Sequence, residues 1–69
     1  MKFYEVLLAV VQHGREIGRV CVLVSAMSRF DAALAAEGEV EDQYGSGSYG
    51  HIIKIDAIEA AEYYSLQAA

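Results

Sequence analysis

Two nearly continuous runs of hydrophobic residues make up most of the first part of the chain, in contrast to the mixed pattern that follows. Residues 2–12 (KFYEVLLAVVQ) are rich in β-branched and aromatic side chains and hold no helix start signal, and residues 16–25 (EIGRVCVLVS) are similar in composition. Both stretches predict strands. Between them His13-Gly14-Arg15 supplies a break, since Gly14 is free to adopt a positive φ. The pattern therefore predicts an antiparallel β-hairpin with a short loop.

This hairpin would present two apolar faces. If the even-numbered residues of both strands share a face, that face is wholly apolar, whereas the odd-numbered face is apolar except for Glu5 and Arg19. Register does not follow from the sequence, and a one-residue slip would exchange the two sets. One helix covers one face of a sheet. The second face therefore requires the C-terminal segment, a second copy of the chain or another partner.

A helix is predicted after the hairpin, in the segment SAMSRFDAALAAE. Ser28 is a good N-cap residue, and Asp31 at the third helical position supplies a weaker form of the capping box. The alanines that follow have the highest helix propensity. We expect the helix to cover at least residues 29–37, and Gly38 is either its end or a tolerated weak point. The face that the spacing predicts as buried consists of Phe30, Ala33 and Leu34, with Glu37 one turn further on.

The remaining segments complete a two-layer fold. Residues 44–50 (YGSGSYG) have the composition of a flexible loop, and residues 51–57 (HIIKIDA) predict a third strand. In that strand Ile53 and Ile55 would face the helix, and Lys54 and Asp56 would face outward.

The tail IEAAEYYSLQAA is ambiguous, because alanine and glutamate favour a helix whereas its paired tyrosines suit a strand; we favour a short helix. The fold class is α+β: a single domain over residues 1–69. It has an antiparallel sheet of about three strands in the order β-β-α-β, one packed helix and a C-terminal helix or strand.

Charge divides the chain into two unlike halves. Residues 1–29 carry four bases and two acids, whereas residues 30–69 carry one base and eight acids, so the halves are +2 and −7 and sum to the formal −5. This balance argues against direct binding to nucleic acid, because phosphate contacts need clustered lysine and arginine. It favours binding to basic protein surfaces. The apolar stretch at residues 6–11 is too short for a membrane span, so no membrane role is expected.

Candidate chemistry is sparse. Cys21 is the one cysteine, which we predict to be a small buried hydrophobe and which fits a reducing cytoplasm. His13 and His51 lack the companions of a metal site, and the acidic run lacks the register of a calcium loop. Because no nucleophile–base arrangement stands out either, we expect a protein that is not an enzyme and needs no cofactor or metal.

One literal motif match has the wrong context. Residues 45–50 match G-x-G-x-x-G, but the dinucleotide fingerprint needs a helix after its glycines, whereas a strand is predicted here. The segment is therefore interpreted as a mobile loop, or as a recognition loop that presents Tyr44 and Tyr49 on a pliable backbone.

The layout resembles that of small proteins of phages and mobile elements, several anti-CRISPR proteins among them. The resemblance spans residues 1–58 and rests on GREIGRVCVLVSAMSRFDAALAAE followed by GHIIKIDAI. It implies an inhibitor in the bacterial host cytoplasm that mimics DNA and occupies the basic channel or PAM-reading site of a CRISPR effector complex. Charge and the two tyrosines select the partner-binding candidates, which are Glu37, Glu39, Glu41, Asp42, Tyr44, Tyr49, Asp56, Glu59 and Glu62.

A second function belongs to a different class. The second apolar face of the sheet would suit a homo-oligomeric structural or accessory protein, since a two-fold partner could cover it. Both functions are compatible with a possible homodimer, because a dimer can also inhibit.

Overall fold

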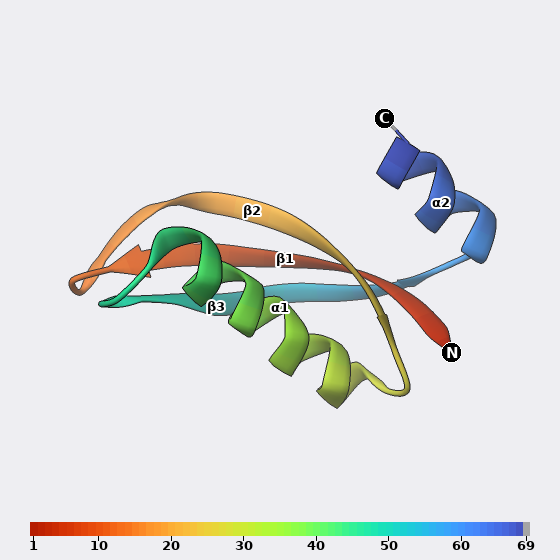
Figure 1. Cartoon of the computed structure of the whole chain (residues 1–69), viewed down its shortest axis with the longest axis horizontal. Coiled ribbons are helices and arrows are strands. Elements are labelled where there is room, and N and C mark those ends of the chain that lie inside the picture. Colours follow the sequence, from red (N-terminus) through yellow and green to blue (C-terminus); the bar gives the residue numbers. More distant parts are fainter. Residues whose placement is uncertain (69) are drawn as a thin grey trace.

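The computed structural model describes residues 1–68 as one three-stranded sheet with two helices (Figure 1). The elements are β1 (Lys2–Gln12), β2 (Arg15–Ala26), α1 (Arg29–Tyr44), β3 (Ser48–Ile58) and α2 (Ala60–Ala68). The strands are antiparallel in the order β2-β1-β3, so β1 is central and both other strands are edges. This confirms the α+β class, and the tail, left open between helix and strand, is a helix.

The hairpin pairs its strands with the two even-numbered sets on one face. Tyr4 lies opposite Val24, Val6 opposite Val22, and Leu8 opposite Val20. We call this side, which α1 covers, the α1 face. The opposite side, which begins at Phe3 and continues through Leu7 along β1, is the α2 face. The wholly apolar surface that the alternation predicted is therefore the one that packs against α1, where Val6 and Leu8 are fully buried.

The hairpin turn is tight and is followed by a bulge. His13 and Gly14 both have positive φ, at 52° and 78°, as a type I′ turn requires. Val10 pairs with Gly18 but Val11 pairs with Glu16, so Ile17 has no partner. The bulge shifts the side-chain alternation by one residue, which places Glu16 on the same face as Arg19, and the two side chains form an ion pair at 3.7 Å.

Helix α1 begins as the sequence predicts and runs further. Ser28 is the N-cap, and its hydroxyl accepts a hydrogen bond from the backbone N–H of Asp31 at 3.2 Å. Gly38 does not end the helix, which continues to Tyr44 and closes with Gly45 N–H donating to the Glu41 carbonyl at 2.9 Å. The extension adds Glu39, Glu41 and Asp42 to the helix.

The predicted buried face of α1 is wrong. Ala32, Ala36 and Val40 are fully buried, whereas Phe30 is 72% exposed and Leu34 is 53% exposed. The reason is size: the sheet already supplies Tyr4 and the large aliphatic side chains of its α1 face, so a stripe of small residues lets the helix lie close to the strands.

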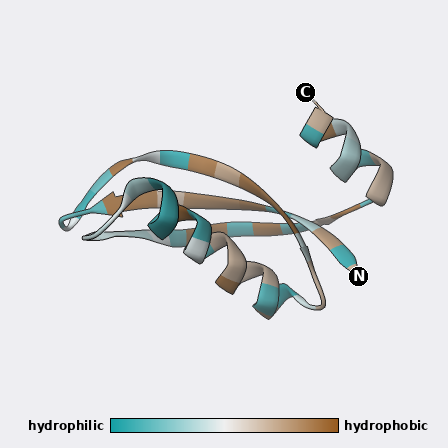
Figure 2. Ribbon diagram, in the orientation of Figure 1, coloured by the Kyte–Doolittle hydropathy of each residue, from teal (hydrophilic) through white to brown (hydrophobic). Residues whose placement is uncertain are grey.

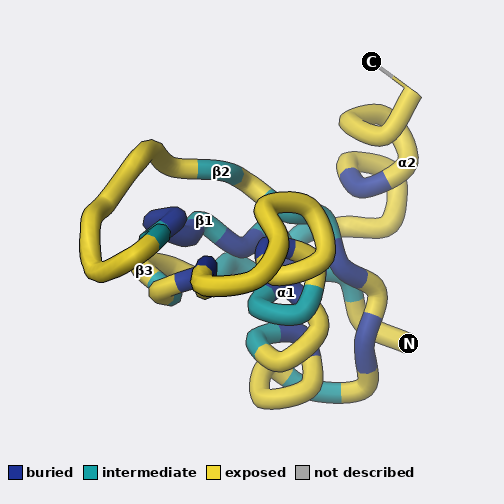
Figure 3. The backbone as a smooth tube through the Cα atoms, turned by 60° about the vertical axis from the view of Figure 1, so that its left-hand side comes forward, coloured by how far each residue is buried: buried dark blue, intermediate teal, exposed yellow. Residues whose placement is uncertain are grey.

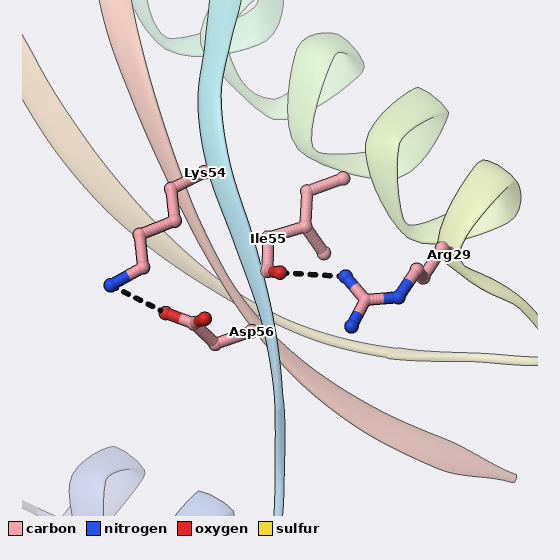
Figure 4. Close-up of polar contacts among 4 residues, drawn as sticks. All are labelled: Arg29, Lys54, Ile55 and Asp56. Atoms are coloured by element: carbon pink, nitrogen blue, oxygen red, sulfur yellow. Dashed lines mark hydrogen bonds and ion pairs between the residues drawn. The ribbon is translucent and has the colours of Figure 1, made fainter.

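Strand β3 contains a second bulge that corrects another expectation. Leu7 pairs with Lys54 and Leu8 with Ile52, so Ile53 has no partner and is 42% exposed. Ile53 therefore does not face the helix, and Ile52 takes that place. Ile55 does pack against the core, as predicted. Lys54 and Asp56 lie together on the other side of β3 from Arg29, whose guanidinium donates to the Ile55 carbonyl at 2.7 Å (Figure 4).

Helix α2 packs on one end of the α2 face. The Phe3 ring lies 4.6 Å from the Tyr63 ring and 5.7 Å from the Tyr64 ring, and the two tyrosine rings are edge to face. Tyr63 is the buried residue of a helix that is otherwise exposed (Figure 3). The rest of the α2 face has no helix over it.

Replacing a glycine with alanine should have opposite effects on stability at two positions. At Gly50 an added Cβ would lie 2.7 Å from Leu8 Cδ2 and 3.2 Å from Val40 Cγ2, and both neighbours are fully buried. Gly50→Ala should therefore lower the free energy of unfolding by about 1–3 kcal/mol. At Gly38, inside α1, the added Cβ meets nothing within 4 Å, so Gly38→Ala should raise it by about 0.5–1 kcal/mol. Urea unfolding followed by circular dichroism measures both changes, and equal effects of the two variants would contradict this packing.

Candidate interaction surfaces

Four of the predicted contact residues lie together on the second half of α1. We call Glu37, Glu39, Glu41 and Asp42 the α1 acidic surface. Glu37 is half-buried and the other three are exposed. The hydropathy colouring shows that α1 turns polar toward its C-terminal end (Figure 2). The helical extension past Gly38 is what brings these carboxylates onto one regular scaffold.

The electrostatics of this surface are unfavourable for the helix itself. The last turn of α1 holds no basic residue, so its acids lie near the negative end of the helix dipole. Glu37 and Glu41 are four residues apart, a spacing at which like charges repel. Among the described residues the ion pairs are Arg19–Glu16 and Lys54–Asp56, and neither involves the α1 acidic surface. Helix stability therefore does not account for these four carboxylates.

The other predicted acids lie at the opposite end of the sheet. Asp56 is opposite Glu5 on the α2 face and pairs with Lys54 at 3.3 Å, and Glu59 and Glu62 flank the start of α2. The second half of α1 ends beside Gln12, whose side-chain amide donates to the Tyr44 carbonyl at 3.3 Å.

Since Glu5 and Gln12 are seven positions apart along β1, roughly 23 Å lie between the two ends. The structure thus divides the predicted acids into two groups, as the positions of α1 and α2 show (Figure 1). The structure also adds Glu5 to the second group, although Glu5 belongs to the half of the sequence with net positive charge.

The two candidate tyrosines are also separated. Tyr44 is the last residue of α1 and belongs beside the α1 acidic surface. Tyr49 lies opposite Val11 on the α2 face and is half exposed.

The glycine-rich segment is mostly structural. Within the predicted loop of residues 44–50, only residues 45–47 lie outside helix and strand, so the loop is shorter than expected. Gly45 and Gly47 have positive φ, and a Cβ at Gly47 would lie 2.6 Å from the His13 ring. The Gly47 carbonyl also accepts from the His13 backbone N–H at 3.0 Å. Strand β3 follows directly, so no helix N-terminus meets these glycines as phosphate binding would need.

Residues with reactive side chains remain scattered. In the described range 1–68, no group of three or more His, Cys, Asp or Glu side chains is placed to hold a metal ion. The prediction that Cys21 is buried is wrong: its side chain is exposed on β2. It lies opposite Leu7 on the α2 face, in the part of the sheet that α2 does not reach.

The structure has a groove along β2 that the sequence did not predict. It has a volume of about 770 Å³ and follows residues 20–25 of this edge strand. Ala35, Glu39 and Gln43 of α1 line one side, and Tyr63 and Gln67 of α2 line the other. The uncharged run VCVLV indicates an unprotected strand. It does not predict a groove, because a groove depends on where the two helices lie relative to that strand.

Comparison with protein-family models, curated proteins and solved structures finds no match to this chain. Within the part of the chain that the structure describes, no helix is both long enough and apolar enough to cross a lipid bilayer.

Proposed function

We propose that this protein is a non-enzymatic inhibitor of the anti-CRISPR type. It binds a basic nucleic-acid-binding surface of a CRISPR effector complex in the bacterial cytoplasm and blocks entry of target DNA. The α1 acidic surface supplies the contacts, with Tyr44 at its end. The observation that carries the proposal is that these four carboxylates have no ion-pair partner among the described residues, and that two of them, Glu41 and Asp42, lie in the last turn of α1, where negative charge disfavours the helix.

The charge density of the α1 acidic surface supports mimicry of nucleic acid. Residues 37–42 span roughly 7.5 Å of helix axis and carry four carboxylates, so successive charges are separated by about 2.5 Å along the axis on average. Duplex DNA carries about one charge per 1.7 Å of axis, and one strand carries one per 3.4 Å. A surface that binds phosphates therefore meets a comparable density of negative charge. Asp56, Glu59 and Glu62 would add contacts only where the partner surface also reaches the α2 end.

Binding and DNA competition test the proposal. The tagged protein is used to capture purified effector complexes from a panel of CRISPR types, and increasing amounts of target duplex DNA are then added. We expect at least one complex to be retained and to be released by the DNA, because inhibitor and DNA share one basic surface. Retention of no complex, or retention that saturating DNA does not change, would contradict the proposal.

Homo-oligomerisation is the second candidate, and one observation favours it. Helix α2 covers the Phe3 end of the α2 face, while Leu7 and Leu23 remain half-buried without a covering element. The same face also carries acidic, basic and histidine side chains, which a second copy would have to bury, and these are Glu5, Glu16, Arg19, His51, Lys54 and Asp56. Burying charges is costly even where they are paired, as Arg19–Glu16 and Lys54–Asp56 are, so the inhibitor remains the favoured function.

A further inference from the structure

Strand β2 has an open edge. It pairs only with β1, so alternate residues along its 12-residue length turn their backbone N–H and C=O groups away from the sheet. Such an edge is a template for another strand unless the protein protects it. The first half of β2 is protected, because Arg15, Glu16 and Arg19 are charged and Ile17 is bulged. From Val20 to Val24 no charge, proline or bulge interrupts the strand.

The other edge of the sheet is protected differently. The unpaired Ile53 bends β3, Lys54 adds a charge, and the Arg29 side chain from α1 occupies the Ile55 carbonyl. The contrast indicates that the open stretch of β2 is not a general feature of this small sheet.

Two helices turn the open edge into a groove. Residues 20–25 form its floor, Ala35 and Glu39 of α1 rise on one side, and Tyr63 and Gln67 of α2 rise on the other. Its volume of about 770 Å³ falls within the range of ligand-binding clefts. A strand paired with β2 would lie between the helices, with alternate side chains turned toward each of them.

We propose that this groove binds an extended, basic segment of another protein as a fourth strand paired with β2. Backbone hydrogen bonds supply pairing. The apolar side chains of the segment lie on the α2 side, beside Cys21, Leu23 and Tyr63, so the alternate side chains turn toward α1. A lysine or arginine of the segment faces Glu39. This inference goes beyond the inhibitor proposal and does not depend on it. Both use Glu39, but strand pairing needs the β2 edge and neither Glu41 nor Asp42.

Charge selects this occupant over a second copy of the chain. Among the side chains that line the groove, Glu39 is the one of an acidic or basic residue, and it has no ion-pair partner among residues 1–68. Pairing β2 with β2 of a second copy about a two-fold axis would set one α1 beside the other, with acids on both and no base in either second half. A basic segment would neutralise the charge of Glu39, whereas a second copy of the chain would bring another negative charge.

The probe is an acetylated heptapeptide in which valine alternates with lysine. Two controls are the same peptide N-methylated at its three central amides, which cannot pair as a strand, and a heptapeptide that alternates valine with glutamate. Titration calorimetry measures affinity, and amide hydrogen exchange measures protection along residues 20–25. We expect the valine–lysine peptide to bind and to protect alternate amides of β2, and both control peptides to bind at least tenfold more weakly.

Two variants on the same helix sharpen the test. Glu39→Lys, inside the groove, should weaken the valine–lysine peptide at least tenfold, whereas Glu41→Lys, outside it, should change affinity less than twofold; circular dichroism confirms that both remain folded. Absence of β2 protection at millimolar peptide, equal binding of the N-methylated peptide, or equal effects of the two variants would overturn the proposal. So would a dimer in light scattering whose β2 amides are protected without peptide, because the occupant would then be a second copy.

Discussion

Replacing Leu8 with alanine should leave most of the protein unfolded at 37 °C. Leu8 is fully buried at the centre of the α1 face, between Val20 of β2 and Ile52 of β3, and it contacts Gly50 closely enough that a Cβ there would clash. Truncating a buried leucine costs about 2–5 kcal/mol, the sum of lost burial and the cavity left behind. A domain of this size rarely has more than about 3–5 kcal/mol of stability in total.

Urea unfolding measures this effect, with tyrosine fluorescence and far-ultraviolet circular dichroism as two independent signals. The control is Leu34→Ala, because Leu34 is on the exposed side of α1 and alanine has the higher helix propensity. We expect that control to change stability by less than about 0.5 kcal/mol. If Leu34→Ala destabilises as much as Leu8→Ala, then α1 packs through the face that periodicity predicted and not through its small residues.

The hairpin and the helix start could be predicted because their signals are local. Alternation along residues 2–12 identifies two faces, Gly14 supplies the turn, and Ser28 supplies an acceptor for a free backbone N–H at the helix start. Each signal depends on residues close in sequence, so tertiary packing had little to change. The register did not follow from the sequence. The structure aligns the even-numbered residues of the two strands, and that register buries the wholly apolar set against α1.

The predictions were wrong where the burial of a side chain depends on packing between the helices and the sheet. Large residues on α1 looked like its buried face, but the space left by the strands admits only Ala32, Ala36 and the single larger Val40. Bulges at Ile17 and Ile53 changed which side chains share a face, and no local residue marks either position. The separation of Asp56 from the α1 acidic surface, and the groove along β2, follow from where the helices lie.

Reversing two charges of the α1 acidic surface should abolish binding to the effector complex. Glu41→Lys together with Asp42→Lys changes the net charge by +4 and converts two attractive contacts to repulsive ones. We expect affinity to fall roughly a hundredfold, because paired charges at protein interfaces contribute strongly and like charges repel. The fold should tolerate the change, because both residues are exposed. A lysine near the C-terminus of a helix also interacts favourably with the helix dipole, whereas an acid there does not.

A matched variant separates position from total charge. Glu59→Lys together with Glu62→Lys makes the same change in net charge at the start of α2, outside the α1 acidic surface. The decisive measurement is the affinity of both double variants and the original protein for one retained effector complex, at two salt concentrations. Loss of binding in the α1 variant alone, with the salt dependence of the original protein largely absent from it, is the expected result. Equal affinities for all three proteins would show that the carboxylates of α1 do not form the binding surface.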